Sequence, residues 1–155
     1  MNTRVVIIGG GPSGLLLSKL LLSEGIDNIV LEKQSKQHVI GRVRAGVLEN
    51  GTIEMLRLAG VSERLDKEGF MHDGVFLSFK NHGFRIDLKK LTNKNVTVYG
   101  QTEVTKDLYD AIEKSNGISF RCRIPMAQPF ASAAVLRRPL SAHVADYALP
   151  AAVLL

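Results

Sequence analysis

A glycine-rich segment near the start of the chain has the residue types that bind phosphate groups. Gly9, Gly11 and Gly14 follow an apolar run at the spacing Gly-x-Gly-x-x-Gly. In this arrangement the first glycine permits a tight turn, the second lets phosphates approach the backbone, and the third lets a helix pack closely on a strand. Glu32 ends a second apolar run eighteen residues after Gly14, where a carboxylate can accept hydrogen bonds from a ribose. The spacing predicts a nucleotide cofactor; a purely structural glycine turn, the alternative, leaves Glu32 unexplained.

The segments on either side of these glycines have the patterns of the elements that would position them. The apolar, β-branched run over residues 4–8 predicts a strand buried on both faces of a parallel sheet. Pro12 and Ser13 suit the first positions of a helix that continues to about Glu24, with Gly25 as its C-cap. Residues 28–31 predict the next strand. This order of strand, glycine turn, helix and strand predicts an α/β fold. In such a fold the first amides of the helix face a pyrophosphate.

The remaining residues before position 120 contain further helix and strand patterns. From Gly74 the apolar period changes to two, and a turn at 81–83 separates two such runs, the second reaching Leu88. This pattern predicts an antiparallel hairpin. The other predicted elements are a helix over 49–58, strands over 96–99 and from 118, and a helix over 102–114 with Val104, Leu108, Ala111 and Ile112 on one face.

The composition is that of an ordinary globular protein and excludes several classes of function. The 155 residues are 45% apolar and 23% charged with a net charge of +5, and no basic stripe with interleaved aromatics indicates nucleic acid. No stretch approaches the roughly 20 apolar residues that span a bilayer, and the N-terminus lacks a signal-peptide pattern. Cys122 is the only cysteine, which excludes a cysteine-based zinc site. We expect a cytoplasmic protein with no metal, nucleic-acid or membrane partner.

The composition changes after residue 120. All fourteen glycines and all ten lysines precede residue 118, whereas residues 121–155 contain nine alanines and four prolines. Neither a helical nor a strand period holds across 127–155. We interpret 121–155 as sequence from a shifted reading frame or an unrelated junction; a natural alanine-rich tail is the alternative. The predicted boundary therefore separates residues 1–120 from 121–155.

A second segment that could bind phosphates runs from Arg42 to Glu49. Side chains at i and i+2 of an extended segment project to the same side, so Arg42 and Arg44 can meet a pyrophosphate together through bidentate donors. A solvated basic turn is the alternative for Arg42. Together with the glycine segment and residues 99–105, this segment resembles the flavoprotein aromatic hydroxylases, most closely those of the 4-hydroxybenzoate 3-monooxygenase type, over about residues 1–120.

The resemblance implies an FAD site and assigns most of its residues. The glycine segment would hold the FAD phosphates, Glu32 the adenosine ribose and Arg44 the pyrophosphate, while Arg42 would add positive potential where the nicotinamide cofactor docks. Gln101 would contact the ribityl side of the flavin, with an exposed helix cap as the alternative. The implied phosphate ligands are Gly9, Gly11, Ser13 and Gly14, and the segment along the flavin ring is Ala45, Gly46 and Val47. Val43 is a further implied cofactor-binding residue.

Two further assignments also come from the resemblance. Lys33, Gln34 and His38 would select the nicotinamide cofactor together with the two arginines, and a lysine after the ribose acid favours NADPH, with NADH or dual use left open. His72 matches a histidine that passes a proton from the phenol to solvent in this family, which suits a side chain that titrates near neutrality. An ordinary surface histidine before a strand is the alternative for His72.

As a whole, the resemblance implies the N-terminal portion of a Rossmann-type FAD-binding domain with three layers (ββα) and part of a β-rich second layer over about 74–99. Such an enzyme takes electrons from NADPH or NADH, uses O2 and hydroxylates an aromatic substrate; a homodimer is left open. We expect this chain to be inactive alone and to expose a sheet edge and apolar surface. Another Rossmann-type NAD(P)-binding oxidoreductase and a nucleotide-binding fragment without chemistry are the alternatives.

Overall fold

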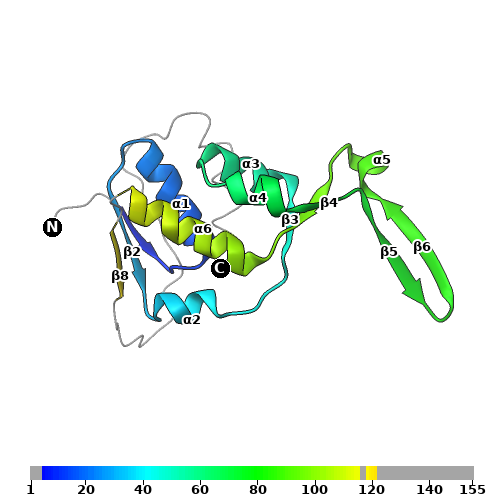
Figure 1. The fold of residues 1–155 in the computed structure, drawn as a ribbon, viewed down its shortest axis with the longest axis horizontal. Helices are drawn as coiled ribbons and strands as arrows, with labels where there is room; N and C mark the ends of the chain where they lie inside the picture. Colours follow the sequence, from blue (N-terminus) through cyan, green and yellow to red (C-terminus); the bar gives the residue numbers. More distant parts are fainter. Residues whose placement is uncertain (1–4, 116–117, 122–155) are drawn as a thin grey trace.

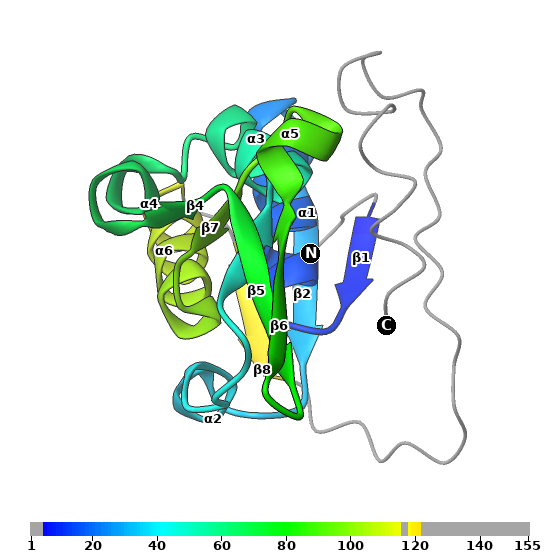
Figure 2. The same ribbon diagram turned by 90° about the vertical axis from the view of Figure 1, so that its right-hand side faces the viewer.

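A small parallel sheet holds the start of the chain. The computed structural model describes residues 5–115 and 118–121 (Figure 1). Strands β1 (Val5–Ile8), β2 (Asn28–Glu32) and β8 (Ile118–Arg121) are parallel in the order β1-β2-β8, and Ile7 lies opposite Val30. Helices α1 (Pro12–Ser23) and α6 (Gln101–Lys114) pack against each other on one side of this sheet (Figures 1 and 2). The predicted α/β class and the unit of strand, glycine turn, helix and strand are confirmed.

The first strand is buried on one face only, so the expectation of a strand buried on both faces was wrong. Val5 and Ile7 are 4% and 6% exposed, whereas Val6 and Ile8 are 44% and 52% exposed. The buried pair packs under α1 against Leu21 and Val30. No described element covers the opposite face, so alternate side chains of β1 remain in contact with solvent.

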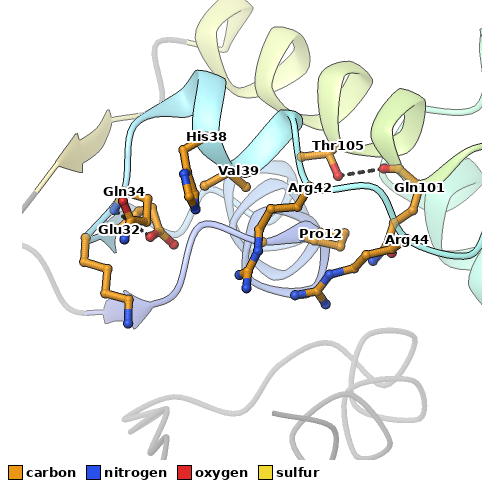
Figure 3. A pocket seen from close by; sticks show the side chains of 11 residues that line it. Pro12, Glu32, Gln34, His38, Val39, Arg42, Arg44, Gln101 and Thr105 are labelled. Atoms are coloured by element: carbon orange, nitrogen blue, oxygen red, sulfur yellow. Dashed lines mark hydrogen bonds between the residues drawn. The ribbon is translucent and has the colours of Figure 1, made fainter.

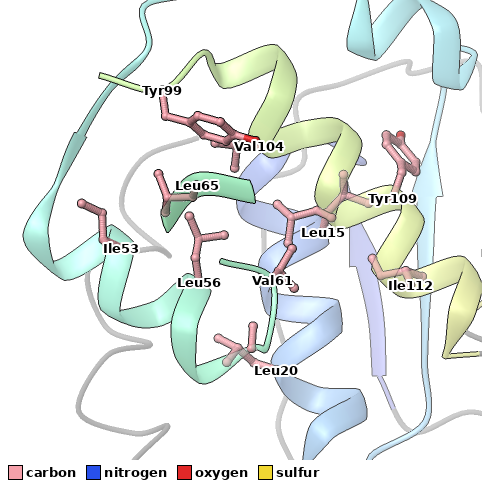
Figure 4. Close-up of a cluster of buried hydrophobic side chains, with 12 residues drawn as sticks. Leu15, Leu20, Ile53, Leu56, Val61, Leu65, Tyr99, Val104, Tyr109 and Ile112 are labelled. Carbon is pink, nitrogen blue, oxygen red and sulfur yellow. The ribbon is translucent and has the colours of Figure 1, made fainter. Parts of the chain in front are cut away.

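The main core lies between helices. Besides α1 and α6 it is built by α3 (Asn50–Leu58) and α4 (Glu63–Glu68) (Figure 4). Of the predicted apolar positions on α6, Val104, Leu108 and Ile112 are buried and Ala111 is half-buried. A buried polar contact fixes α1 to the sheet: the Ser18 hydroxyl donates to Asn28 Oδ1 at 2.6 Å. The largest fully buried side chains are Leu15, Leu21, Leu56, Leu108, Ile112 and Val30.

The β-rich part forms two further sheets. Strands β3 (Val47–Glu49), β7 (Val96–Val98) and β4 (Phe70–His72) are antiparallel in the order β3-β7-β4. Strands β5 (Gly74–Phe79) and β6 (His82–Asp87) form the predicted hairpin, which projects away from the helices (Figure 1). Helices α2 (Lys36–Ile40) and α5 (Leu88–Thr92) complete the described elements.

Some predicted boundaries differ from the structure for local reasons. Leu88 does not extend the second strand of the hairpin, because the Asp87 carboxylate accepts a hydrogen bond from Lys90 N at 2.8 Å and caps α5 there. Glu49 ends β3 and is the N-cap of α3 rather than its first residue. The sequence did not predict the short elements α2, β3, α4, β4 and α5, each of six residues or fewer. The predictions for residues 122–155 lie outside the described residues.

Large apolar side chains are exposed on the hairpin and beside it, as expected. Phe76, Phe79 and Phe84 are 67%, 73% and 62% exposed, and Phe70 and Leu91 are each 70% exposed. A two-stranded hairpin without a covering layer is marginally stable in water. Within the described residues this surface has no covering element.

The passage from β1 into α1 leaves no room for a side chain at Gly14. A Cβ at this position would lie 2.0 Å from the carbonyl oxygen of Gly9, which itself has φ +114°. At Gly51, in the first turn of α3, nothing lies within 4 Å of an added Cβ. The two glycines therefore differ in their tolerance of a methyl group although both lie near a helix N-terminus.

This difference predicts opposite effects on stability. Gly14→Ala should lower the free energy of unfolding by about 3 kcal/mol or more, since backbone must move to relieve the overlap. Gly51→Ala, the matched control, should raise it by about 0.4–1 kcal/mol by restricting the unfolded chain. Urea denaturation followed by circular dichroism measures both. Equal stabilities for the two variants would contradict the close packing of α1 on β1.

Candidate nucleotide-binding site

A backbone hydrogen bond anchors the start of the turn between β1 and α1. Gly9 N donates to the carbonyl of Leu31 at 2.8 Å, which ties the turn to β2. Gly11 is the N-cap of α1 without a side-chain hydrogen bond, and Pro12 occupies the first helical position. Nothing lies within 4 Å of a Cβ added to Gly11. The backbone at Gly11 therefore borders open space. It lies at the start of a helix, which is where phosphates bind.

The carboxylate of Glu32 is part of the same turn. Its Oε2 accepts a hydrogen bond from Gly10 N at 2.8 Å, and its Oε1 accepts one from Gln34 N at 2.8 Å. A carboxylate has about four lone-pair positions, so each oxygen retains a free position for a ligand hydroxyl. Sequence reasoning assigned Glu32 to a ribose alone and missed that it also holds the turn.

Arg42 and Arg44 lie on the loop that joins α2 to β3. Both are exposed, and in Figure 3 their side chains extend to the same side, as their spacing predicted. Neither guanidinium, nor the ammonium of Lys33, forms a salt bridge within residues 5–115 and 118–121. Three cations are therefore available to an anionic ligand.

These segments enclose a cavity of about 260 Å³ between the glycine turn, the end of β2, α2, the arginine loop and α6 (Figure 3). Among the described residues that line it, Glu32 is the only acid beside three cations, so their summed charge is positive. Eight predicted residues line the cavity: Gly11, Glu32, Lys33, Gln34, His38, Arg42, Arg44 and Gln101.

The other predicted site residues do not line this cavity. Gly9, Ser13 and Gly14 belong to the turn and the first turn of α1, while Val43, Ala45 and Val47 are exposed on the arginine loop and β3. Gly46 contacts the start of α6, since an added Cβ would lie 2.7 Å from Gly100 Cα. His72 is the last residue of β4, where it is exposed opposite Val96. The structure does not bring His72 to the cavity.

Helix α6 adds residues that sequence reasoning missed. Thr105 lines the cavity one turn after Gln101, and its hydroxyl donates to the Gln101 carbonyl at 2.7 Å. One turn further, the Tyr109 hydroxyl donates to the carbonyl of Gly10 at 3.0 Å. The spacing of four residues was the available signal, because positions i, i+4 and i+8 share a helix face. Val39 of α2 also lines the cavity and had no such signal.

An ion-pair cluster fixes the start of α6. Arg64 of α4 donates to Glu103 at 2.8 Å and to Asp107 at 2.7 Å, and the Tyr99 hydroxyl donates to Asp107 at 2.7 Å. The hydrogen bond and charge of Lys106, with those of Arg64, hold the pKa of Glu103 below its ordinary value. Burial, followed by the Asp107 contact, raises the pKa of Tyr99. Gln101 is thereby held on a fixed helix end.

Two other features are absent from the described part of the chain. No helix there is long and apolar enough to cross a membrane. No group of three or more His, Cys, Asp or Glu side chains is placed there to hold a metal ion.

Comparison with known proteins agrees with this geometry. A family model described as an FAD binding domain matches residues 2–127. The p-hydroxybenzoate hydroxylase of Acinetobacter baylyi is 47% identical over 121 residues, which cover 77% of this chain and 30% of that protein. The pentachlorophenol 4-monooxygenase of Sphingobium chlorophenolicum is 25% identical over 116 residues, which cover 72% of this chain and 21% of that protein. The chain thus spans less than a third of the length of these curated relatives.

Solved structures show the same fold at lower identity. The p-nitrophenol 4-monooxygenase PnpA of Pseudomonas putida superposes with a TM-score of 0.65 at 22% identity, covering 76% of this chain and 31% of that one. PqsL of Pseudomonas aeruginosa, solved with 2-aminobenzoylacetate, superposes with a TM-score of 0.67 at 15% identity, covering 76% and 32%. These likenesses concern the fold.

The double hydrogen bond of Glu32 predicts a loss of stability when its charge is removed. Glu32→Gln places an amide NH2 against one of two backbone N–H donors, which should lower the free energy of unfolding by about 1–3 kcal/mol. Glu24→Gln, at an exposed position, should change it by less than about 0.5 kcal/mol. Urea denaturation measures the free energy of unfolding of both variants. Equal values for Glu32→Gln and Glu24→Gln would show that Glu32 does not hold the turn.

Proposed function

Since this chain belongs to the FAD binding domain family, we propose that the cavity beside the β1–α1 turn holds the ADP half of FAD. The observation that carries this proposal is the combination of the Gly11 amide at the start of α1, which lines the cavity, with three cations that have no salt bridge in the described residues. Both are donors suited to phosphate. The single acid, Glu32, has free lone pairs for ribose hydroxyls.

The residue assignments follow from this placement. The turn containing Gly9, Gly11, Ser13 and Gly14 would face the phosphates, with Arg44 reaching the pyrophosphate. Gln101 would lie on the ribityl side and the loop around Gly46 along the flavin ring. Bound FAD would supply the redox chemistry, while these residues bind and orient it.

A nicotinamide cofactor is proposed to approach along α2 and the arginine loop. Lys33, Gln34, His38 and Arg42 all line the cavity. Figure 3 shows Gln34, His38 and Arg42 there. A lysine beside the ribose acid can accept a 2′-phosphate, which favours NADPH over NADH. This arrangement would leave Arg44 shared between the pyrophosphate and the approaching cofactor.

For the whole protein we propose hydroxylation of 4-hydroxybenzoate ortho to its phenol, giving 3,4-dihydroxybenzoate with O2 and NADPH or NADH as co-substrates. The likeness to p-hydroxybenzoate hydroxylase supports this reaction. We propose the proton-relay role of His72 for the whole protein alone. In the described residues His72 is exposed and does not line the cavity. The 155-residue chain is proposed to bind FAD without hydroxylating, as a cytoplasmic protein for which a homodimer is left open.

FAD binding by the chain tests the site directly. Titration of FAD, followed by flavin fluorescence, should show saturable binding. Arg44→Ala should weaken it about tenfold to a hundredfold, the loss expected for a charge-assisted hydrogen bond. Arg85→Ala, on the exposed hairpin, is the matched control and should leave the affinity unchanged.

The outcomes separate the alternative functions. Binding of NADPH without FAD would favour another Rossmann-type oxidoreductase. Binding of neither FAD nor NADPH would overturn the proposed nucleotide site in this chain.

A turnover assay tests the proposed inactivity. With FAD, NADPH, O2 and 4-hydroxybenzoate present, the purified chain should form no 3,4-dihydroxybenzoate above the protein-free rate. Chromatography of the products measures this. Formation of that product in proportion to protein concentration would overturn the proposal that the chain is inactive alone.

A further inference from the structure

The peptide units of Gly10 are held from two directions. Its N–H donates to Glu32 Oε2 at 2.8 Å, and its carbonyl accepts from the Tyr109 hydroxyl at 3.0 Å. Gly10 is buried, and a Cβ added there would lie 2.9 Å from Glu32 Cβ and 3.0 Å from the Tyr109 oxygen. A strand residue, a helix residue and the turn therefore meet at one point.

The bond from Tyr109 also sets the direction of the next amide. The Gly10 carbonyl and the Gly11 N–H belong to one planar trans peptide, so they point in opposite directions. With the carbonyl directed to Tyr109 on α6, the Gly11 N–H is directed away from that side chain. No hydrogen bond from this N–H occurs within the described residues, and Gly11 lines the cavity. The amide is thus a free donor in a defined orientation.

The tyrosine is itself well fixed. Its side chain is 4% exposed in the core cluster (Figure 4), and Lys36 Nζ lies 5.2 Å from its ring centroid. Lys36 in turn pairs with Glu113 at 2.8 Å, which joins α2 to α6. Burial raises the pKa of Tyr109, and the negative charges of Glu32 and Glu113 add to this. The hydroxyl therefore keeps its proton at neutral pH and remains a donor.

We propose that Tyr109 is a positioning residue for FAD binding: its hydroxyl orients the Gly10–Gly11 peptide so that the Gly11 N–H faces the phosphates. This inference rests on the proposed FAD site and extends it to a side chain that does not line the cavity. The tyrosine acts through the turn and makes no contact with the cofactor.

Tyr109→Phe isolates this role, because it removes the hydroxyl and retains the ring beneath Lys36. Its Kd for FAD should rise about fivefold, the effect of one neutral hydrogen bond, at a temperature where circular dichroism shows the variant folded. The matched control is Ser18→Ala, which removes another buried hydroxyl bond, from α1 to Asn28, outside the cavity. This control should lose stability and keep the FAD affinity of the unsubstituted chain.

Amide hydrogen exchange gives a second readout that needs no ligand. In Tyr109→Phe the Gly10 amide should exchange faster while the amide of Val30 in β2 is unchanged; in Ser18→Ala the Gly10 amide should be unaffected. Equal FAD affinity and equal Gly10 exchange in Tyr109→Phe and the unsubstituted chain would overturn the inference and leave the FAD site standing. Failure of the unsubstituted chain to bind FAD would overturn both proposals.

Discussion

The abrupt passage from β1 into α1 is the constraint on which the rest of the structure depends. Gly14 brings the helix so close to the end of the strand that a methyl group would overlap the Gly9 carbonyl. Because β1 and β2 are parallel, the amides of α1 and the carboxylate of Glu32 emerge at the same edge of the sheet. Ligands of open parallel sheets bind at this edge. The tight glycine turn therefore sets the position of the cavity with its positively charged lining.

Helix α6 contributes side chains to both the core and the site, and Tyr109 belongs to both. Val104, Leu108 and Ile112 fill the core, whereas Gln101, Thr105 and Tyr109 follow one another toward the turn. Charges are divided in the same way. Lys36, Arg64 and Lys106 are paired with acids, and the cations of the cavity wall have no salt bridge within the described residues. An anionic ligand would therefore neutralise charge that the fold itself leaves uncompensated.

Several features could be predicted because each depends on local spacing. They are the glycine motif with its flanking strands β1 and β2, helix α6, and the shared direction of Arg42 and Arg44. Short elements such as α2 and α4 could not, since a few residues carry too little periodicity to identify them. The exposed face of β1 was missed because a run of β-branched residues does not reveal which face will be covered. The spacing of Tyr109 from Gln101 places the two on one helix face, but it does not reveal the partner of Tyr109, which is a backbone carbonyl 99 residues away. Backbone acceptors have no signature in side-chain patterns.

The two halves of the proposed FAD site rest on parts of the chain that are packed to different degrees. The turn, Glu32 and α6 lie on a core whose largest side chains are less than 2% exposed. The loop expected along the flavin ring carries Val43 at 93% and Val47 at 58% exposure. Contacts made by rigid groups lose less conformational entropy on binding than contacts made by mobile ones. The ADP half of the site should therefore contribute most of the affinity for FAD, because its donors are already fixed before the cofactor binds. The half along the flavin ring should contribute little unless a further part of the protein packs over this loop.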